Sequence, residues 1–414
     1  MTQLHRLYVL IFSSHHIEDS YAYEHIVYIN HVKYINNITL KIFMNKFDSI
    51  RPYNDGEVSS VLKSLCEDKD FLNTVALMQQ FKHFQYLPFS KKILSILLKN
   101  KIKGIYSIKG YQSFFEQIVT YVIDNTIDDF HIEGLNNLSN KKSYLFISNH
   151  RDITLDSALL NFQLHKNNLK TTNNAVGNNL LTEKWASDLM RLNKSFIIDR
   201  SDKFKKDIYK SLKLASEFIY DCITAKNESI WIAQKQGRSK DGVDYTDPSV
   251  LKMIHLNSRK KTEVSEYFNN LKLVPVSVSY EKDPNDILKA KELYLRSVNT
   301  DYVKEKNEDL KSIFVGISGH KGNVHIEVGE PMLFSNKEDY DEIAKITTKK
   351  IRSMYKIHAT NIAACILQGI KIPIQHGFTN DEIDESMQWL KERLHDIPED
   401  MQPFLLNQYS NPVL

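Results

Sequence analysis

The sequence has no long apolar run and few cysteines, and both absences limit the kind of protein it can be. No stretch reaches the roughly 18 to 20 apolar residues that a membrane-spanning helix needs. The apolar residues 7–12 are too few for the core of a signal peptide. Cys66, Cys222 and Cys365 are isolated and lack metal-ligand spacing. These features predict a protein of a reducing, cytoplasmic compartment with buried structural thiols.

An excess of charge of one sign is also missing, which argues against nucleic acid as a partner. The 54 Lys and Arg residues nearly balance the 51 Asp and Glu residues, so the net charge is +3 on 414 residues. Any basic surface must therefore be local. The length predicts roughly two to three structural units, or one large α/β domain with additions.

Residues 1–43 differ in composition from the rest of the chain. They hold five histidines and five tyrosines, with little charge and no glycine or proline. Met44 then begins a polar segment with an Asn-Asp-Gly turn signal at residues 54–56. Two interpretations stay open: the natural start is Met44 and residues 1–43 are extra, or they form a short accessory segment.

Helical spacing of apolar residues follows, and we predict that residues 44–128 form a helical region that can contact a membrane. Residues 91–110 combine Ile and Leu with six lysines. Such a segment can lie in a membrane interface with its lysines near anionic headgroups. It can equally be a solvated helix that packs on the core while its lysines extend into water.

From residue 130 the pattern changes to short apolar or β-branched runs that alternate with helical stretches. The expected strands are residues 143–148, 195–199, 229–233, 273–280 and 322–331. This alternation predicts an α/β fold over residues 129–335, with a largely parallel central sheet flanked by helices. Residues 336–414 form an expected C-terminal helical region, in which Thr379 and Glu382 match a capping box.

The tripeptide His-Arg-Asp of a protein kinase catalytic loop occurs at residues 150–152, but the other kinase features are absent from the sequence. A kinase has a metal-binding asparagine five residues after the aspartate, and Ser157 is at that position. A Gly-rich loop upstream and an Asp-Phe-Gly motif downstream are also missing. We therefore do not interpret the tripeptide as a kinase loop.

Acyl transfer is the alternative chemistry for this histidine. His150 follows the expected strand 143–148 and precedes a helix-like run, so it should lie at the carboxyl edge of the sheet, where ligands bind in such folds. Transfer from a thioester to an alcohol needs a general base, which a histidine oriented by a carboxylate supplies near neutral pH. Arginine or lysine side chains would hold an acceptor that carries a phosphate.

Four ordered blocks resemble the glycerol-3-phosphate and lysophosphatidate acyltransferase family over about residues 143–280. They are SNHRDITLDS (148–157), SFIIDRS (195–201), QKQGRSKDG (234–242) and LVPVSVSY (273–280). The resemblance implies that His150 is the catalytic base and that Asp156 orients it. It also implies that the acceptor is bound by the following residues of the second and third blocks: Arg200, Gln236, Gly237 and Arg238.

Two departures from the family pattern bear on these roles. The family has four residues between His and Asp, but Leu155 stands at that place and Asp156 is one residue further on. Asp152 is the alternative partner of His150, or a carboxylate with a structural role at a helix N-terminus. The family has Glu where this chain has Gln236, which keeps the hydrogen-bonding reach and loses the charge.

The resemblance also implies the partners and the setting of the reaction. Acyl-CoA or acyl-carrier protein would be the acyl donor in phospholipid synthesis, and no metal or other cofactor is expected. His255, His320, His325 and His376 lack the partner spacing of a metal site. The protein is expected to be cytoplasmic and peripheral on the inner face of the membrane. The alternative is a non-catalytic relative that binds lipid or acyl-carrier protein.

Overall fold

The computed structural model describes residues 46–76, 90–178, 183–201, 204–299, 302–303, 308–335 and 337–414. Contacts divide the chain into two units, Met1–Ser49 and Ile50–Leu414. Residues 1–43, for which two interpretations were open, lie outside the described residues. The predicted boundaries within the second unit stay predictions.

Seven strands of the described chain form one central sheet in the order β1-β7-β6-β2-β5-β3-β4. β6 and β7 run antiparallel, and the other neighbouring strands run parallel. The strands are β1 (Phe130–Glu133), β2 (Leu145–Ser148), β3 (Thr172–Gly177), β4 (Ser195–Ile198), β5 (Ser229–Ala233), β6 (Leu273–Tyr280) and β7 (Val324–Val328). The predicted α/β fold with a largely parallel sheet is confirmed.

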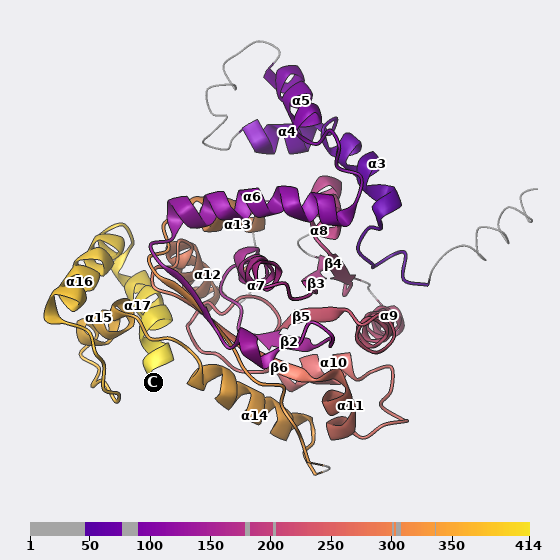
Figure 1. Cartoon of the computed structure of the whole chain (residues 1–414). Coiled ribbons are helices and arrows are strands. Elements are labelled where there is room, and N and C mark those ends of the chain that lie inside the picture. The colour runs from indigo at the N-terminus through magenta and orange to yellow at the C-terminus, as the bar shows by residue number, and fades with distance from the viewer. Residues whose placement is uncertain are drawn as a thin grey trace, which may run out of the picture. The chain divides into compact units, whose positions relative to one another are not determined.

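Helices cover both faces of this sheet, as the alternating sequence pattern predicts (Figure 1). On one face, α6 (Ile108–Thr126) and α7 (Leu155–Lys166) share a buried cluster with β2, β6 and β7. The other face is covered by α9 (Lys205–Thr224), α10 (Pro248–Ile254) and α14 (Tyr340–Ser353). All residues of β2 and β6 are buried, because a strand inside a two-sided sheet has no solvent-facing side.

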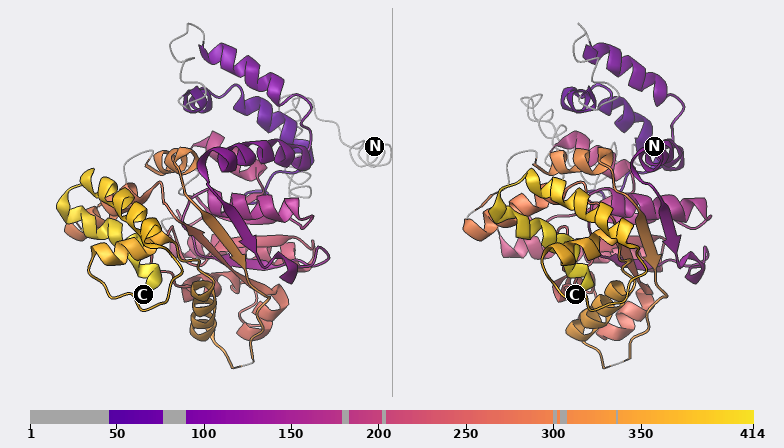
Figure 2. Two further views of the ribbon diagram at one scale, coloured as in Figure 1. Left: turned by 60° about the vertical axis from the view of Figure 1, so that its left-hand side comes forward. Right: turned by 90° about the vertical axis from the view of Figure 1, so that its left-hand side faces the viewer.

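The remaining helices lie before, between and after the strands. They are α3 (Asp55–Leu65), α4 (Lys69–Ala76), α5 (Ser90–Lys101), α8 (Lys184–Leu192), α11 (Val264–Leu271), α12 (Asp286–Val298), α13 (Glu308–Ser318), α15 (Ala359–Leu367), α16 (Asn380–His395) and α17 (Gln402–Ser410). Figure 2 shows α15, α16 and α17 gathered beside the sheet, where they share a buried cluster with α12. The expected capping box of Thr379 and Glu382 begins α16.

Two strands, β1 and β3, were not expected because their sequences are polar. In β1, Phe130 and Ile132 pack against the core cluster, while His131 and Glu133 are exposed. In β3, the Thr172 hydroxyl donates to Oδ1 of Asn174 over 2.7 Å. A polar side chain that finds a hydrogen-bond partner can be buried, and hydrophobic pattern rules do not detect this.

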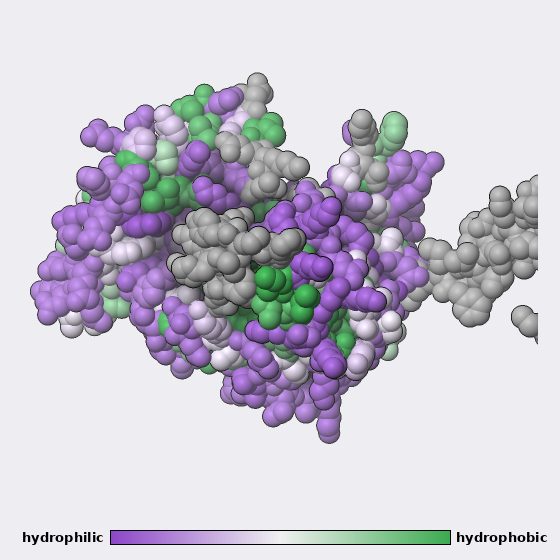
Figure 3. Space-filling view, turned by 90° about the horizontal axis from the view of Figure 1, so that it is seen from above, coloured by the Kyte–Doolittle hydropathy of each residue, from purple (hydrophilic) through white to green (hydrophobic). Residues whose placement is uncertain are grey.

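The helical region before the sheet exposes apolar side chains. Leu94 of α5 is buried, whereas Ile93, Ile96 and Leu97 are 39%, 52% and 41% exposed. Figure 3 shows the face above α5 and α6, where hydrophobic patches interrupt a mostly hydrophilic surface. Among the described residues, no helix has the length and apolar character to span a membrane.

Candidate active site

His150 and Asp156 are joined by a hydrogen bond at the carboxyl end of β2. The turn of residues 149–154 connects β2 to α7, and it places Nδ1 of His150 2.8 Å from Oδ2 of Asp156. A carboxylate only accepts, so Nδ1 carries the proton and Nε2 of the neutral ring has a free lone pair. The His150 side chain is 14% exposed, which leaves the ring accessible to a substrate.

Asp156 is fully buried and is held by several donors. Its Oδ2 accepts the backbone N–H groups of Arg151 and Asp152 over 2.6 and 3.1 Å. Its Oδ1 accepts the Tyr280 hydroxyl over 2.8 Å. Burial, together with the charge of Asp156, raises the pKa of Tyr280 well above its usual value, so this hydroxyl stays a donor. The carboxylate therefore has a fixed orientation toward His150.

Asp152 has a different role from Asp156. Its Oδ1 accepts the backbone N–H groups of Thr154 and Leu155, each over 2.9 Å, and so caps the start of α7. A Cβ atom at Gly316 would lie 2.1 Å from Oδ2 of Asp152, so α13 approaches this carboxylate through a glycine. Of the two aspartates considered from the sequence, Asp156 forms the hydrogen bond with His150, and Asp152 has the geometry of a helix cap.

The residues on either side of His150 anchor the turn to the sheet. Asn149 exchanges hydrogen bonds with the backbone of Val278 in β6, over 3.0 Å as donor and 2.7 Å as acceptor. Arg151 donates from Nη2 to Oδ2 of Asp244 over 2.5 Å, and this pair is buried. Nη2 of Arg151 is therefore paired with Asp244, while its buried Nε has no hydrogen-bond partner among the described residues.

The loop after β5 runs alongside the turn that carries His150. The backbone N–H of Gln234 donates to the carbonyl of Ser148, and that of Ser239 donates to the carbonyl of His150, each over 2.7 Å. β2 and β5 are parallel neighbours, so their carboxyl ends meet at one edge of the sheet. These bonds keep residues 236–238 next to His150.

Arg200 and Gln236 are brought together from different strands. Arg200 follows β4, and its Nη1 donates to Oε1 of Gln236 over 2.8 Å. Burial lowers the pKa of the Arg200 guanidinium, which means that its charge is incompletely solvated. The neutral Gln236 therefore positions Arg200 without cancelling its charge.

Gly237 adopts a left-handed conformation with φ of +76°, which explains why glycine suits this position. No described atom lies within 4 Å of the place where a Cβ would be. Glycine is therefore favoured at position 237 by the backbone conformation and not by lack of space, because the space beside its backbone is open.

Arg238 has a buried nitrogen without a partner. Within the described part of the chain, its Nη1 atom has no hydrogen-bond acceptor. Burial raises the pKa of Asp152 and the charge of Arg238 opposes this rise, so the two groups lie within electrostatic reach. A buried N–H of a guanidinium is normally hydrogen-bonded, and an anion such as a phosphate would satisfy it.

The structure thus places the predicted site residues on the loops that follow β2, β4 and β5, except Asp156, which lies in the first turn of α7. Sequence reasoning did not identify Tyr280 and Asp244, which hold Asp156 and Arg151 in place. Tyr280 ends an apolar strand at the same edge of the sheet. A hydroxyl at that position could have indicated from the sequence a hydrogen-bond donor close to the site. Asp244 gave no such signal, because it lies in an irregular loop.

The fold and the geometry define a class of protein: an α/β domain with a carboxylate-held histidine at the carboxyl edge of its sheet and arginines on adjacent loops. Residues 129–243 match the family model described as Acyltransferase. This part of the chain is similar to that family, and the match covers less than half of the chain.

Comparison with solved structures adds a distant likeness. The chain is similar to the crystal structure of the 1-acyl-sn-glycerophosphate (LPA) acyltransferase PlsC from Thermotoga maritima, at 13% sequence identity and a TM-score of 0.35. That alignment covers 72% of this chain and 94% of the other. At this TM-score the likeness carries no weight for the fold or the function. No curated protein sequence matches the chain.

Proposed function

We propose that the protein transfers a fatty acyl group from acyl-CoA or acyl-carrier protein to a hydroxyl of glycerol 3-phosphate or a lysophosphatidate. The observation that carries this proposal is the His150–Asp156 hydrogen bond, together with the Arg238 loop, in which the backbone N–H of Ser239 donates to the carbonyl of His150. Nη1 of Arg238 has no hydrogen-bond partner among the described residues. A base and an anion-binding group in one place are what acyl transfer to a phosphate-bearing alcohol requires. The product would enter phospholipid synthesis.

The chemistry follows from which nitrogen of His150 is free. Nε2 takes the proton of the acceptor hydroxyl as its oxygen attacks the thioester carbonyl. The tetrahedral intermediate then expels the thiolate, which takes the same proton back from His150. Asp156 keeps the proton on Nδ1 and stabilises the imidazolium between these steps. No bond between the acyl group and the protein is needed.

Arg200 and Arg238 would hold the phosphate of the acceptor and so position its hydroxyl near His150. This chain has Gln236 where the family pattern has Glu, and a neutral residue at that position fits the phosphate-binding role of Arg200. A glutamate at hydrogen-bond distance from Arg200 would form an ion pair with it and so compete with the phosphate. Gln236 has no negative charge, yet its side-chain oxygen still accepts a hydrogen bond that orients the Arg200 guanidinium.

A panel of acceptors tests the proposal directly. Purified protein is incubated with radiolabelled acyl-CoA or acyl-carrier protein and with glycerol 3-phosphate, lysophosphatidate, glycerol or monoacylglycerol. We expect turnover of a phosphate-bearing acceptor above the background of the His150→Ala variant. Binding of these acceptors without turnover would instead support the non-catalytic relative.

Replacing Arg238 by glutamine should weaken the binding of a phosphate-bearing acceptor more than the binding of an acceptor without phosphate. A hydrogen bond to a charged group contributes about 1.5–3 kcal/mol, so KM should rise by roughly 10- to 150-fold. The ratio of kcat/KM between glycerol 3-phosphate and glycerol measures this effect. Arg352→Gln, an exposed arginine outside these loops, is the control. Equal losses for both acceptors would contradict a phosphate-binding role for Arg238.

We also propose that the helical region with α5 contacts the cytoplasmic surface of the membrane, where the product is formed. The exposed apolar side chains Ile93, Ile96 and Leu97 support this, because they lie on a helix that is rich in lysine. Leu94 on the same helix packs against α4, so α5 has both a packed side and an exposed apolar side.

Reversing the charge of Lys91, Lys92 and Lys101 should release the protein from anionic vesicles. Each lysine near such a surface contributes about 1 kcal/mol, so the three changes to glutamate should weaken binding by roughly 100-fold or more. Co-flotation with phosphatidylglycerol vesicles measures it. The matched control changes three other exposed lysines to glutamate: Lys260, Lys261 and Lys391. Equal flotation of both triple variants would contradict α5 as the contact.

A further inference from the structure

The strands β1 and β7 carry the same tripeptide side by side. Residues 131–133 and 325–327 both read His-Ile-Glu, and these strands pair in parallel with His131 opposite His325 and Glu133 opposite Glu327. Side chains two residues apart on a strand point to the same face. The register therefore gathers two imidazoles and two carboxylates on one face of the strand pair.

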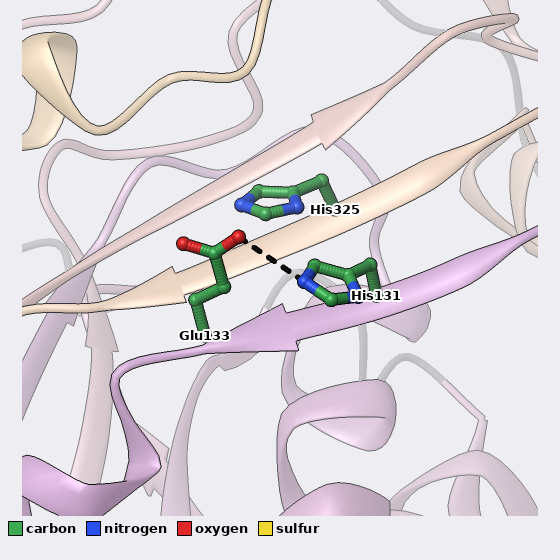
Figure 4. Close-up of side chains that lie close together, drawn as sticks. All are labelled: His131, Glu133 and His325. Carbon is green, nitrogen blue, oxygen red and sulfur yellow. Dashed lines mark hydrogen bonds and ion pairs between the residues drawn. The ribbon is translucent and has the colours of Figure 1, made fainter.

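The nitrogen and oxygen atoms of this group already converge. One ligand-capable atom each of His131, Glu133 and His325 lies within 4.8 Å of the others, and Figure 4 shows the Glu133 carboxylate beside both rings. Nε2 of His131 is 3.1 Å from Oε1 of Glu133. A Zn²⁺ ion bound at about 2.0–2.2 Å would need its donor atoms roughly 3–4 Å apart, so small side-chain rotations would suffice.

The charges around the group also suit a cation. His325 is buried, so few water molecules compete for its ring nitrogens, and an imidazole nitrogen is a common metal ligand. Glu133 lies opposite Glu327 in the register, so two carboxylates stand side by side and a bound cation would offset their repulsion.

We propose that His131, Glu133 and His325 bind one divalent cation, with Glu327 available as a fourth ligand. Zn²⁺ fits this donor set best, since imidazole nitrogen and carboxylate oxygen are among its preferred ligands. The ion would tie the edge strand β1 to β7. The expectation of no metal came from spacing along the sequence, and the distance between the two tripeptides hid this arrangement.

This site is separate from His150. On the opposite face of β1, Phe130 and Ile132 pack into the core cluster that contains Leu159 of α7. The donors His131 and Glu133 therefore face away from α7 and from the turn that carries His150. β1 is also where the acyltransferase match begins, so the cation would secure the first strand of that domain.

Titration of the full chain with Zn²⁺ tests this inference. The protein is stripped with a chelator, and Zn²⁺ is added in competition with a chromophoric chelator. We expect one Zn²⁺ per chain and a higher Tm with the metal, because it binds the folded state. His131→Ala should weaken binding by at least about 10- to 100-fold, the range found for removing even an outer-shell partner.

His320→Ala is the matched control. His320 is also exposed and has Nε2 2.8 Å from a carboxylate oxygen of Asp128, but it does not belong to the group described above. Should His131→Ala fail to fold by circular dichroism, Glu133→Gln replaces it with the same expected loss. Absence of Zn²⁺ binding by the wild type, or equal affinity in the wild type and the His131 or Glu133 variant, would overturn the proposal.

Discussion

Replacing His150 by alanine should lower kcat for acyl transfer by roughly 100- to 10,000-fold, the range that a general base contributes. The acceptor hydroxyl would then attack without losing its proton to Nε2. KM for the acceptor should change little, because the arginines that would hold its phosphate are intact. Steady-state kinetics with acyl-CoA and the best acceptor of the panel measures both constants.

His165→Ala is a suitable control for this variant. His165 lies on α7, is partly exposed and has Nε2 3.5 Å from a carboxylate oxygen of Glu116, so it is a histidine near an acid outside the site. Its loss should leave kcat unchanged. If the His150 variant keeps more than about a tenth of the wild-type kcat, general-base catalysis by this residue is excluded.

Replacing Asp156 by asparagine should be nearly as damaging to kcat. The amide oxygen carries no negative charge, so it does not stabilise the imidazolium that forms when His150 takes the proton of the acceptor. In serine-protease triads this change costs about 10⁴-fold. Asparagine keeps an oxygen to accept the backbone N–H of Arg151, so the fold should survive.

Asp152→Asn is the matched comparison, since both aspartates are buried, one in the turn before α7 and one in the first turn of that helix. An asparagine at 152 can still cap α7 and has no hydrogen bond to His150 to lose. We expect a kcat near that of the wild type for this variant, with the Asp156 variant far below it. The reverse order would assign the orienting carboxylate to Asp152.

Much of the sheet could be predicted because its central strands are buried on both faces. β2, β5 and β6 are runs of apolar residues, and such runs have few alternatives to a strand inside a parallel sheet. β3 escaped prediction because Thr172, Asn173 and Asn174 satisfy their polar groups with partners that only the folded chain supplies.

The sequence blocks predicted which residues belong to the candidate site. They did not predict which of these residues form hydrogen bonds with one another. The choice between Asp152 and Asp156 depended on where α7 begins. A continuous helix would have misaligned residues 150 and 156, and the turn that ends at Thr154 removes this difficulty. The partner of Gln236 was equally hidden, because Arg200 reaches it from another strand.

The position of β6 has a consequence for how much of the chain is needed. The acyltransferase match ends at residue 243, yet β6 is hydrogen-bonded to β2 in the middle of the sheet. A protein cut at 243 would leave β2 as an open edge, with Asn149 and Asp156 deprived of Val278 and Tyr280. The shortest segment that keeps the sheet and the candidate site intact must therefore extend well past residue 243.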